Sequence, residues 1–214
     1  MIELYSWATG NGRRASIMLE ESGLAYTVRP MELQTKVQKE PWYLKINPYG
    51  RIPAIVDRGE GDKDFAEPVV VFESGAILIY LAEKSGRLLP TAAPARAETL
   101  KWLFFQTSDV GPMAMQVHWL GRLKEAGKPH HNLDVYRDEV MTLYGIMDRR
   151  LGEAPYLAGD YSIADVAAYP WVFRHDMQEI DLATFTNLSA WFDRVAARPA
   201  VQRGMNIPAR KDGL

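Results

Sequence analysis

Residues 47–56 decide the first half of the fold, and they read Asn47-Pro-Tyr-Gly-Arg-Ile-Pro53-Ala-Ile-Val56. The apolar run after Pro53 is short and rich in β-branched residues, which is typical of a strand. A proline directly before a strand belongs at a sheet edge or in a special turn, because it has no N–H to donate. If the Ile52–Pro53 bond is cis, the backbone of Ile52 is presented to a ligand as a short strand partner.

The segments around this turn predict a mixed α/β domain. Helical spacing covers Ala15–Ser22, which ends at Gly23, and returns over Ser74–Lys84. The turn-forming residues Gly59–Asp64 separate two of the strands. The order β-α-β, an irregular stretch, then β-β-α predicts a mixed sheet with a right-handed crossover, covered by helices. Four short runs have strand character: Ile2–Tyr5, Tyr26–Arg29, Ile52–Val56 and Val69–Phe72.

Beyond residue 87 the pattern changes to helices. Gly111-Pro112 lies within the first of them and predicts a kink, because the apolar spacing resumes after it. Ser162-Ile-Ala-Asp165 has the spacing of a capping box. We therefore expect an α/β domain over residues 1–87 and an all-α helical bundle over 88–214, with Arg203–Leu214 as a solvated tail. The expected helices are Ala95–Ala126, Leu133–Leu151, Ser162–His175 and Asn187–Ala197.

The composition of the chain excludes several kinds of reactive site. The chain has 214 residues, a net charge of −2 and no cysteine. A protein disulfide, a thiolate metal site and a cysteine nucleophile are therefore excluded. The near-neutral charge gives no support for binding nucleic acid or an anionic membrane surface. No signal peptide and no run of 18 apolar residues is present, so the cytoplasm is the expected location.

The turn after the first strand, Trp7–Arg14, is a candidate thiolate site. Its small and polar residues expose backbone amides at a helix start, which favours anions and lowers the pKa of a nearby thiol. Thr9 and Asn11 can donate hydrogen bonds to a thiolate. The alternative is structural, with Asn11 as a helix cap and the glycines shaping the turn.

The chain passes from a predicted strand to a predicted helix at Glu73-Ser74. Together these residues suit a zwitterionic amino-acid head group. Glu73 would take the ammonium, and the hydroxyl and amide of Ser74 would take the carboxylate. A plain helix cap is again the alternative.

Taken in order, Asn47-Pro-x-Gly-x-Ile-Pro53, Glu73-Ser74 and Ser162-Ile-Ala-Asp165 resemble the glutathione transferase superfamily over nearly the whole chain. Thr9-x-Asn11 and Gly111-Pro-Met look like the bacterial Nu class, whose members are glutathione-dependent disulfide-bond reductases. The resemblance implies a thioredoxin-like first domain, a helical second domain and a homodimer. The branches that depend on a protein cysteine are excluded by composition.

The resemblance also implies roles for single residues. Thr9 and Asn11 would contact the glutathione sulfur, whereas Tyr5 lies inside a strand and Ser6 is a weaker alternative. An arginine of the class that reaches the partner subunit is replaced here by Val135, and Arg137 is the candidate substitute. The expected contacts to the peptide are Gln38 and Arg51 at the glycyl end, Ile52 and the cis Pro53 at the cysteinyl part, and Glu73 and Ser74 at the γ-glutamyl head.

The second substrate has fewer candidates. Trp7, Met113 and His118 could line its pocket, although an amphipathic helix explains the last two equally well. His130-His131 resembles a metal pair, but adjacent residues point apart and no third ligand is spaced with them. We expect no metal.

The expected activity is glutathione-dependent thiol–disulfide exchange. The bound thiolate would attack a disulfide sulfur, an electrophilic carbon or a peroxide, and a second glutathione would resolve a mixed disulfide. Two alternatives remain: a conjugating transferase for hydrophobic electrophiles, and a non-catalytic interaction module of the same fold.

Overall fold

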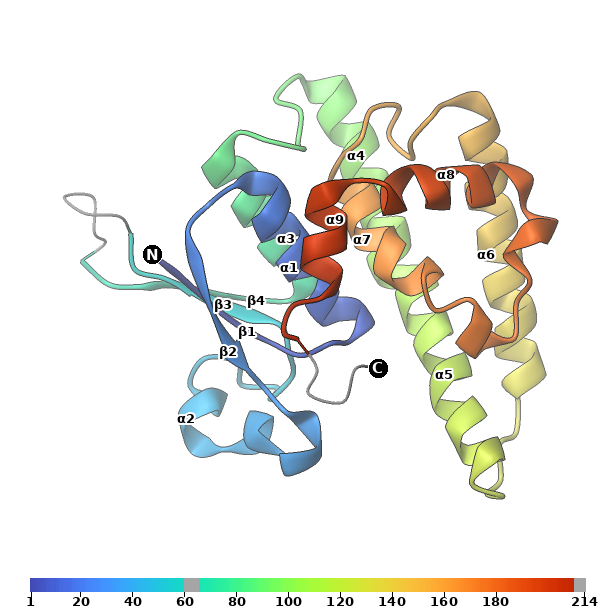
Figure 1. Ribbon diagram of the computed structural model, residues 1–214, viewed down its shortest axis with the longest axis horizontal. Helices are drawn as coiled ribbons and strands as arrows, with labels where there is room; N and C mark the ends of the chain where they lie inside the picture. Colours follow the sequence, from blue (N-terminus) through green and yellow to red (C-terminus); the bar gives the residue numbers. More distant parts are fainter. Residues whose placement is uncertain (60–65, 210–214) are drawn as a thin grey trace. The chain divides into compact units, whose positions relative to one another are not determined.

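The computed structural model describes residues 1–59 and 66–209, and the chain forms two compact units (Figure 1). One comprises Met1–Leu89 together with the C-terminal stretch from Arg198, and the other is Pro90–Ala197. The predicted combination of a mixed α/β first part and a helical second part is confirmed.

The elements of the first unit follow the predicted order. The stretch expected to be irregular contains two 3-10 turns, Leu33–Thr35 and Val37–Lys39, before a short helix. Most of the predicted turn Gly59–Asp64 lies outside the described residues. The elements are β1 (Ile2–Ser6), α1 (Gly10–Ser22), β2 (Tyr26–Pro30), α2 (Pro41–Leu44), β3 (Ala54–Asp57), β4 (Val69–Phe72), α3 (Ser74–Ser85) and α9 (Pro199–Met205).

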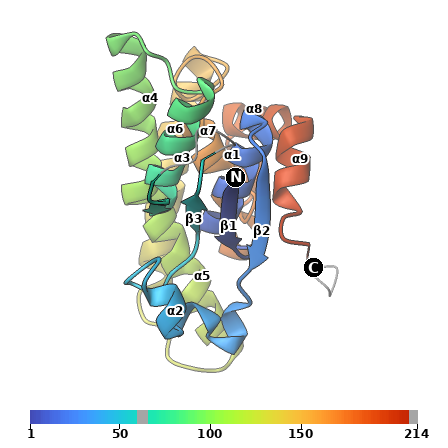
Figure 2. The same ribbon diagram turned by 90° about the vertical axis from the view of Figure 1, so that its left-hand side faces the viewer.

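The sheet has the strand order β2-β1-β3-β4. β1 and β2 are parallel and joined through α1, whereas β3 pairs antiparallel with both β1 and β4. α1 and α3 pack against each other and against the strands (Figures 1 and 2). Gly23 ends α1 in the left-handed conformation, with φ 72°, and donates its N–H to Leu19. This is the stop that the sequence predicts.

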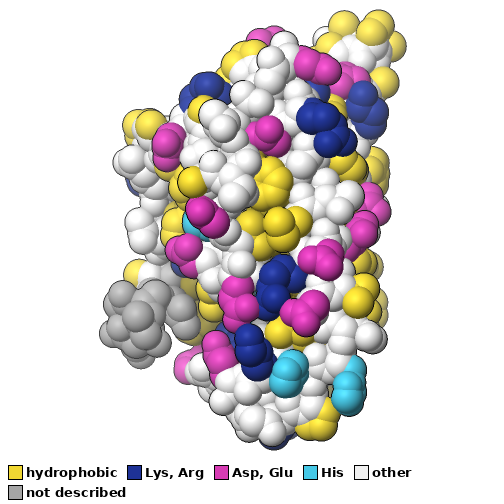
Figure 3. Space-filling view, turned by 90° about the vertical axis from the view of Figure 1, so that its right-hand side faces the viewer, with side chains coloured by type: hydrophobic (Ala, Val, Ile, Leu, Met, Phe, Trp, Pro, Cys, Tyr) yellow, Lys and Arg dark blue, Asp and Glu magenta, His cyan; other side chains and the backbone are white. Residues whose placement is uncertain are grey.

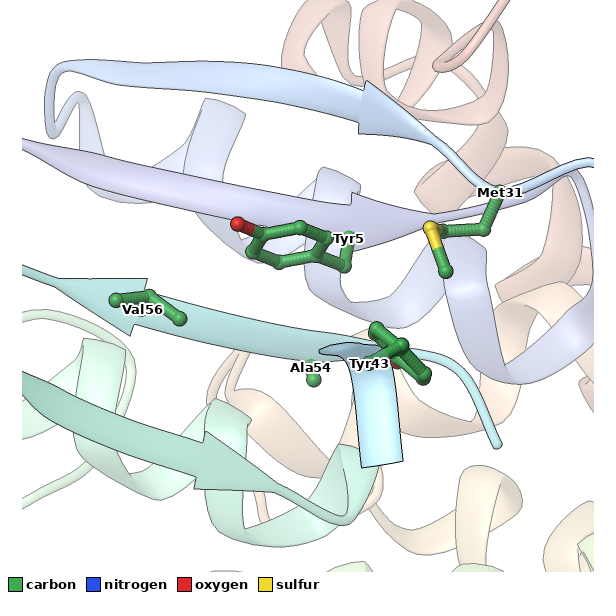
Figure 4. Packing of buried hydrophobic residues seen from close by; sticks show 5 residues of the cluster. All are labelled: Tyr5, Met31, Tyr43, Ala54 and Val56. Atoms are coloured by element: carbon green, nitrogen blue, oxygen red, sulfur yellow. The ribbon is translucent and has the colours of Figure 1, made fainter. Parts of the chain in front are cut away.

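The other face of the sheet carries an aromatic cluster that includes Tyr5. Its ring lies on β1 beside Ala54 and Val56 of β3, with Tyr43 of α2 nearby (Figure 4). The ring centroids of Tyr5 and Tyr43 are 5.9 Å apart. Burial raises the pKa of Tyr5. Tyr5 is therefore a core residue, as its place in the strand predicts.

The C-terminal segment is not the solvated tail that we expected over Arg203–Leu214. Residues up to Met205 belong to α9, which packs against α1. The Ser16 hydroxyl donates to the Gly204 carbonyl at 2.7 Å, and a Cβ on Gly204 would lie 2.5 Å from the Cα of Ile17. Glycine is thus required for the two helices to approach this closely. Arg210–Leu214 lie outside the described residues.

The second unit is mostly helical, with two isolated β-bridges within residues 156–160. The predicted helix over Ala95–Ala126 continues through Gly111-Pro112, but a π-helical turn at Gln106–Val110 divides it. A π turn is a common response to an interrupted hydrogen-bond ladder. The helices are α4 (Ala93–Phe105), α5 (Gly111–Glu125), α6 (Leu133–Glu153), α7 (Ile163–Val172) and α8 (Thr186–Ala196).

α7 is the centre of this unit, because every one of its residues is buried. The predicted capping box is present at its start, between Ser162 and Asp165. The Asp165 carboxylate also accepts from the Leu157 amide at 3.1 Å and from the Trp191 indole at 2.8 Å. Burial raises the pKa of Asp165 to about 6. One buried carboxylate therefore ties α7 to its preceding loop and to α8.

Acidic and basic side chains intermingle on the face that Figure 3 presents.

Within residues 1–59 and 66–209, no helix is both long and apolar enough to cross a membrane.

Candidate functional site

The turn between β1 and α1 is organised by Thr9. This residue is the N-cap of α1, and its Oγ1 accepts from the Gly12 N–H at 3.0 Å. A hydroxyl that accepts through its oxygen still has its own hydrogen to donate. The first turn of α1 contains no acidic residue, so the positive end of the helix is not neutralised there. The turn thus offers a donor and a favourable potential for an anion.

Asn11 lies half-buried in the first turn of α1. The cap that sequence reasoning offered as its alternative role belongs to Thr9 instead. Ser6 is fully buried at the end of β1, and its hydroxyl lies 3.5 Å from the Trp7 carbonyl. Thr9 and Asn11 are both more accessible than Ser6, which supports them as the sulfur contacts.

Gly12 is required by the shape of this turn. A Cβ at this position would lie 2.1 Å from the Trp7 carbonyl oxygen and 2.6 Å from the Ser6 hydroxyl. Both contacts are shorter than van der Waals distance, and the carbonyl belongs to the backbone. The turn can hold Thr9 in place only while position 12 has no side chain.

Gly12→Ala is expected to lower the free energy of unfolding by about 2 kcal/mol, because overpacking of a tight site costs 1–3 kcal/mol. Chemical denaturation measures this loss. Gly121→Ala is the matched control, since a Cβ on Gly121 in α5 meets nothing within 4 Å. That change is expected to stabilise by about 1 kcal/mol through helix propensity. Equal effects at both positions would contradict the steric account.

The loop before β3 is held by Asn47, whose side-chain amide donates to the Arg51 carbonyl at 2.8 Å. The Tyr43 hydroxyl donates to the same carbonyl at 2.7 Å. The Arg51 guanidinium lies over the Tyr49 ring, 4.1 Å from its centroid, and donates to the Tyr49 hydroxyl at 2.8 Å. Arg51 is therefore an exposed cation on a fixed backbone.

The Ile52–Pro53 peptide bond is cis, as the resemblance implies. Ile52 precedes β3, and across the described ranges neither its N–H nor its carbonyl has a hydrogen-bond partner. A bound peptide could pair with both groups as an added strand does. Gln38, in the 3-10 turn Val37–Lys39, is half-buried, and its Oε1 is buried without a hydrogen-bond partner among the described residues.

The step from β4 to α3 has an unusual backbone. Glu73 has φ 69° and ψ 119°, a region that costs energy for any residue with a Cβ. Its side chain does not cap α3. The first intrahelical bond of α3 runs from the Ile77 N–H to the Glu73 carbonyl, so the amide of Ser74 lies ahead of it. Strain of this kind is typical of ligand-binding turns.

Arg14 is a residue of this site that sequence reasoning missed. It is 2% exposed in α1, and its Nη1 donates to the Ser74 hydroxyl at 2.8 Å. Burial lowers the pKa of Arg14 to about 9. A signal was present, since Arg14 stands three and four positions before Ile17 and Met18 and so falls on the apolar face of the helix.

The sheet register brings the three turns together. Tyr5, one residue before the end of β1, pairs with Ala54 at the start of β3, and Ala54 pairs with Phe72 at the end of β4. The turns that follow Tyr5, precede Ala54 and follow Phe72 therefore leave the sheet at one edge. The predicted contacts to sulfur, backbone and head group all lie on these turns: Thr9, Asn11, Ile52, Pro53, Glu73 and Ser74.

The candidates for the second substrate lie on two elements. Trp7 is half-buried in the turn before α1. Met113 and His118 are half-buried on α5. Burial, with Arg174 and Arg122 nearby, lowers the pKa of His118 to about 4. His118 is therefore neutral at pH 7 and can accept or donate a hydrogen bond without carrying charge.

Arg137, the candidate for a contact across subunits, is engaged within its own chain. It donates to the Gln178 carbonyl at 3.2 Å and pairs with Asp134 and Glu179. Val135, at the position where the class has arginine, is 65% exposed. Arg137 could reach a partner only by giving up these contacts.

The histidine pair lies in the loop between α5 and α6. His130 Nδ1 is 2.9 Å from the Lys128 carbonyl. In the part of the chain that the structure describes, no three histidine, aspartate or glutamate side chains are grouped to hold a metal ion. An open depression of about 770 Å³ is lined by this loop but contains none of the predicted site residues.

Comparison with known proteins identifies the family of the chain. Residues 11–84 match the family model of the glutathione S-transferase N-terminal domain, and residues 110–199 match that of the C-terminal domain. The chain belongs to the glutathione S-transferase family.

Among curated proteins, the disulfide-bond oxidoreductase YfcG of Escherichia coli is 40% identical, over 96% of this chain and 94% of the relative. A glutathione transferase from Burkholderia graminis, with two glutathione molecules bound per subunit, has a TM-score of 0.88 at 38% identity, covering 98% of this chain and 89% of that one. One from Pseudomonas putida, with one glutathione disulfide per subunit, has a TM-score of 0.87 at 38% identity, covering 97% and 92%.

Proposed function

We propose that the protein is a glutathione-dependent thiol–disulfide oxidoreductase. The observation that supports this most is the Thr9 cap, which leaves a hydroxyl hydrogen beside the positive end of α1. Such a site stabilises a thiolate, and the chain contains no cysteine of its own. The thiol must therefore arrive on glutathione, as the bound ligands of the related structures suggest.

The reaction needs two exchanges. The glutathione thiolate attacks one sulfur of a disulfide, so that a new S–S bond forms and the other sulfur leaves as a thiolate that takes a proton. A second glutathione thiolate then attacks the mixed disulfide, which gives glutathione disulfide and the second substrate thiol. Two glutathiones are oxidised and one disulfide is reduced.

The peptide would be held along the shared edge of the sheet. Ile52, beside the cis Pro53, would pair its backbone with the cysteinyl part, Gln38 would meet the glycyl end, and Arg51 would lie near the glycyl carboxylate. Glu73 would take the ammonium of the γ-glutamyl head and Ser74 its carboxylate. The unpartnered backbone of Ile52 supports this assignment.

The proposal predicts a higher specific rate with 2-hydroxyethyl disulfide than with 1-chloro-2,4-dinitrobenzene, measured side by side at equal glutathione. The reason is that Thr9 and Asn11 lower the thiol pKa for either reaction, while no group is proposed to polarise a carbon electrophile. A higher rate with the chloronitrobenzene would favour the conjugating transferase. Failure of the protein to be retained on immobilised glutathione would favour the interaction module.

We further propose a cytoplasmic homodimer that uses no metal, with glutathione held by residues 1–87 and the second substrate and dimer contacts supplied by 88–214. A chain without cysteine suits a reducing compartment. Trp7, Met113 and His118 are proposed to line the second-substrate pocket.

A further inference from the structure

Arg14 links the two helices whose first turns belong to the site. It lies in α1, and α1 packs against α3. Its side chain is buried and its Nη1 donates to the Ser74 hydroxyl at 2.8 Å. A buried guanidinium is costly, because the charge loses its hydration.

The hydrogen bond has a direction that matters for Ser74. Arginine can only donate, so the Ser74 oxygen is the acceptor. The hydroxyl hydrogen of Ser74 is then left for another acceptor. The Ser74 N–H also precedes the first intrahelical bond of α3, and the Glu73 side chain does not cap it. Ser74 can therefore present two donors, which suit the two oxygens of a carboxylate.

The turn before α3 carries the negative charge of Glu73, which is proposed to take the ammonium of the head group. The first turn of α3 itself contains no acidic residue, so the carboxylate would lie at the positive end of this helix. Arg14 adds a formal positive charge, and its pKa of about 9 keeps it protonated at neutral pH. A bound carboxylate would meet both at once.

We propose that Arg14 is a positioning residue for the α-carboxylate of the γ-glutamyl head group, acting through Ser74 and through its buried charge. This inference rests on the proposed function, because it takes glutathione to be the ligand. Arg14 would then contribute to selectivity from beneath the binding surface, without touching the peptide itself.

The test compares two peptides. One is glutathione, and the other is γ-aminobutyryl-cysteinyl-glycine, which lacks only the α-carboxylate. The wild type is expected to bind glutathione at least about tenfold more tightly, as one charge-assisted hydrogen bond supports. Arg14→Gln, which is neutral but can still donate to Ser74, is expected to lose most of that preference. Arg14→Lys, which keeps the charge, is expected to retain it within about threefold.

Calorimetric Kd values give the preference, and the pKa of the bound thiol gives an independent readout. That pKa is expected to stay constant in both variants, because Thr9 and Asn11 are untouched. Equal weakening of both peptides by Arg14→Gln would show a merely structural role and overturn the inference. An unchanged preference for glutathione in Arg14→Gln would also overturn the inference.

Ser74→Ala keeps the inference testable if Arg14→Gln does not fold. Without the Ser74 hydroxyl, the preference for glutathione is expected to fall by about tenfold. This is the size of effect that one charge-assisted hydrogen bond supports. If Ser74→Ala kept the full preference for glutathione, Arg14 could not act through Ser74 and the inference would be overturned. A wild type that binds neither peptide would instead contradict the proposed function, which is a distinguishable result.

Discussion

In the double variant Thr9→Ala/Asn11→Ala, the pKa of the bound glutathione thiol is expected to rise by at least about one unit. Two donors to the thiolate are removed, and each hydrogen bond to a charged group contributes about 1.5–3 kcal/mol, where 1.4 kcal/mol is one pKa unit. Turnover of 2-hydroxyethyl disulfide at pH 7 is expected to fall by about tenfold or more, because less thiolate is present.

The pH dependence separates this effect from a general loss of activity. Below the pKa of the bound thiol, the rate follows the thiolate fraction, so the variant is slower. Well above the free thiol pKa of about 8.5, both proteins hold thiolate and the difference is expected to shrink. The pH–rate profile and the ultraviolet absorbance of the thiolate measure both pKa values.

Single variants separate binding of sulfur from capping of α1. Thr9→Ser keeps both the cap and the hydroxyl hydrogen, so it is the matched control and is expected to behave as the wild type. Asn11→Ala leaves the Thr9–Gly12 bond intact and tests the second donor alone. An unchanged thiol pKa together with an unchanged reductase rate in the double variant would refute the assignment of both residues.

Asp165→Ala is expected to lower the free energy of unfolding by about 4 kcal/mol, because each buried donor left without an acceptor costs about 1–3 kcal/mol. The amides of Leu157 and Ser162 and the indole of Trp191 would all lose their acceptor. The melting temperature is expected to fall by about 10 °C, at 2–4 °C per kcal/mol for a chain of this size.

Asp148→Ala is the matched control for this change. Asp148 accepts from the amides of Asn187 and Leu188 at the start of α8, but it is only half-buried. Its loss is expected to cost about 1 kcal/mol, the usual value of a helix cap. Equal costs at the two positions would show that burial of the Asp165 network contributes nothing.

One part of the stabilisation by Asp165 is expected to depend on pH. Burial raises its pKa from 3.8 to about 6, so the folded state holds this proton more tightly than the unfolded state. This proton-linked part is complete below pH 3.8 and is lost as the pH rises through about 6, whereas the hydrogen bonds that the side chain accepts from Leu157, Ser162 and Trp191 persist. Denaturation of the wild type and Asp165→Ala across this range measures the difference.

Local signals account for what the sequence predicted of the fold. Gly23 as the stop of α1, Val69–Phe72 as a strand and the Ser162–Asp165 capping box each depend on neighbours a few residues away. Backbone conformation and side-chain capping act over this range, so spacing alone identifies them. The three turns of the candidate site were predicted in the same way.

The features that the sequence did not predict depend on distant contacts. Arg14 contacts the turn before α3 only because the fold places Ser74 beside it, sixty positions later. Glycine is required at position 204 only because the backbone of Ile17 lies against it. The choice of Thr9 over Asn11 as the cap depends on the exact path of the turn, since either residue type can cap a helix.

The packing of α9 on α1 has a consequence for synthesis. The unit that contains Thr9 is completed by α9, a helix that the ribosome makes long after α1, because Gly204 lies against Ile17. Until α9 has been made, α1 has no partner for that surface. The turn that contains Thr9 therefore reaches its final packing only after the whole helical unit Pro90–Ala197 has been synthesised.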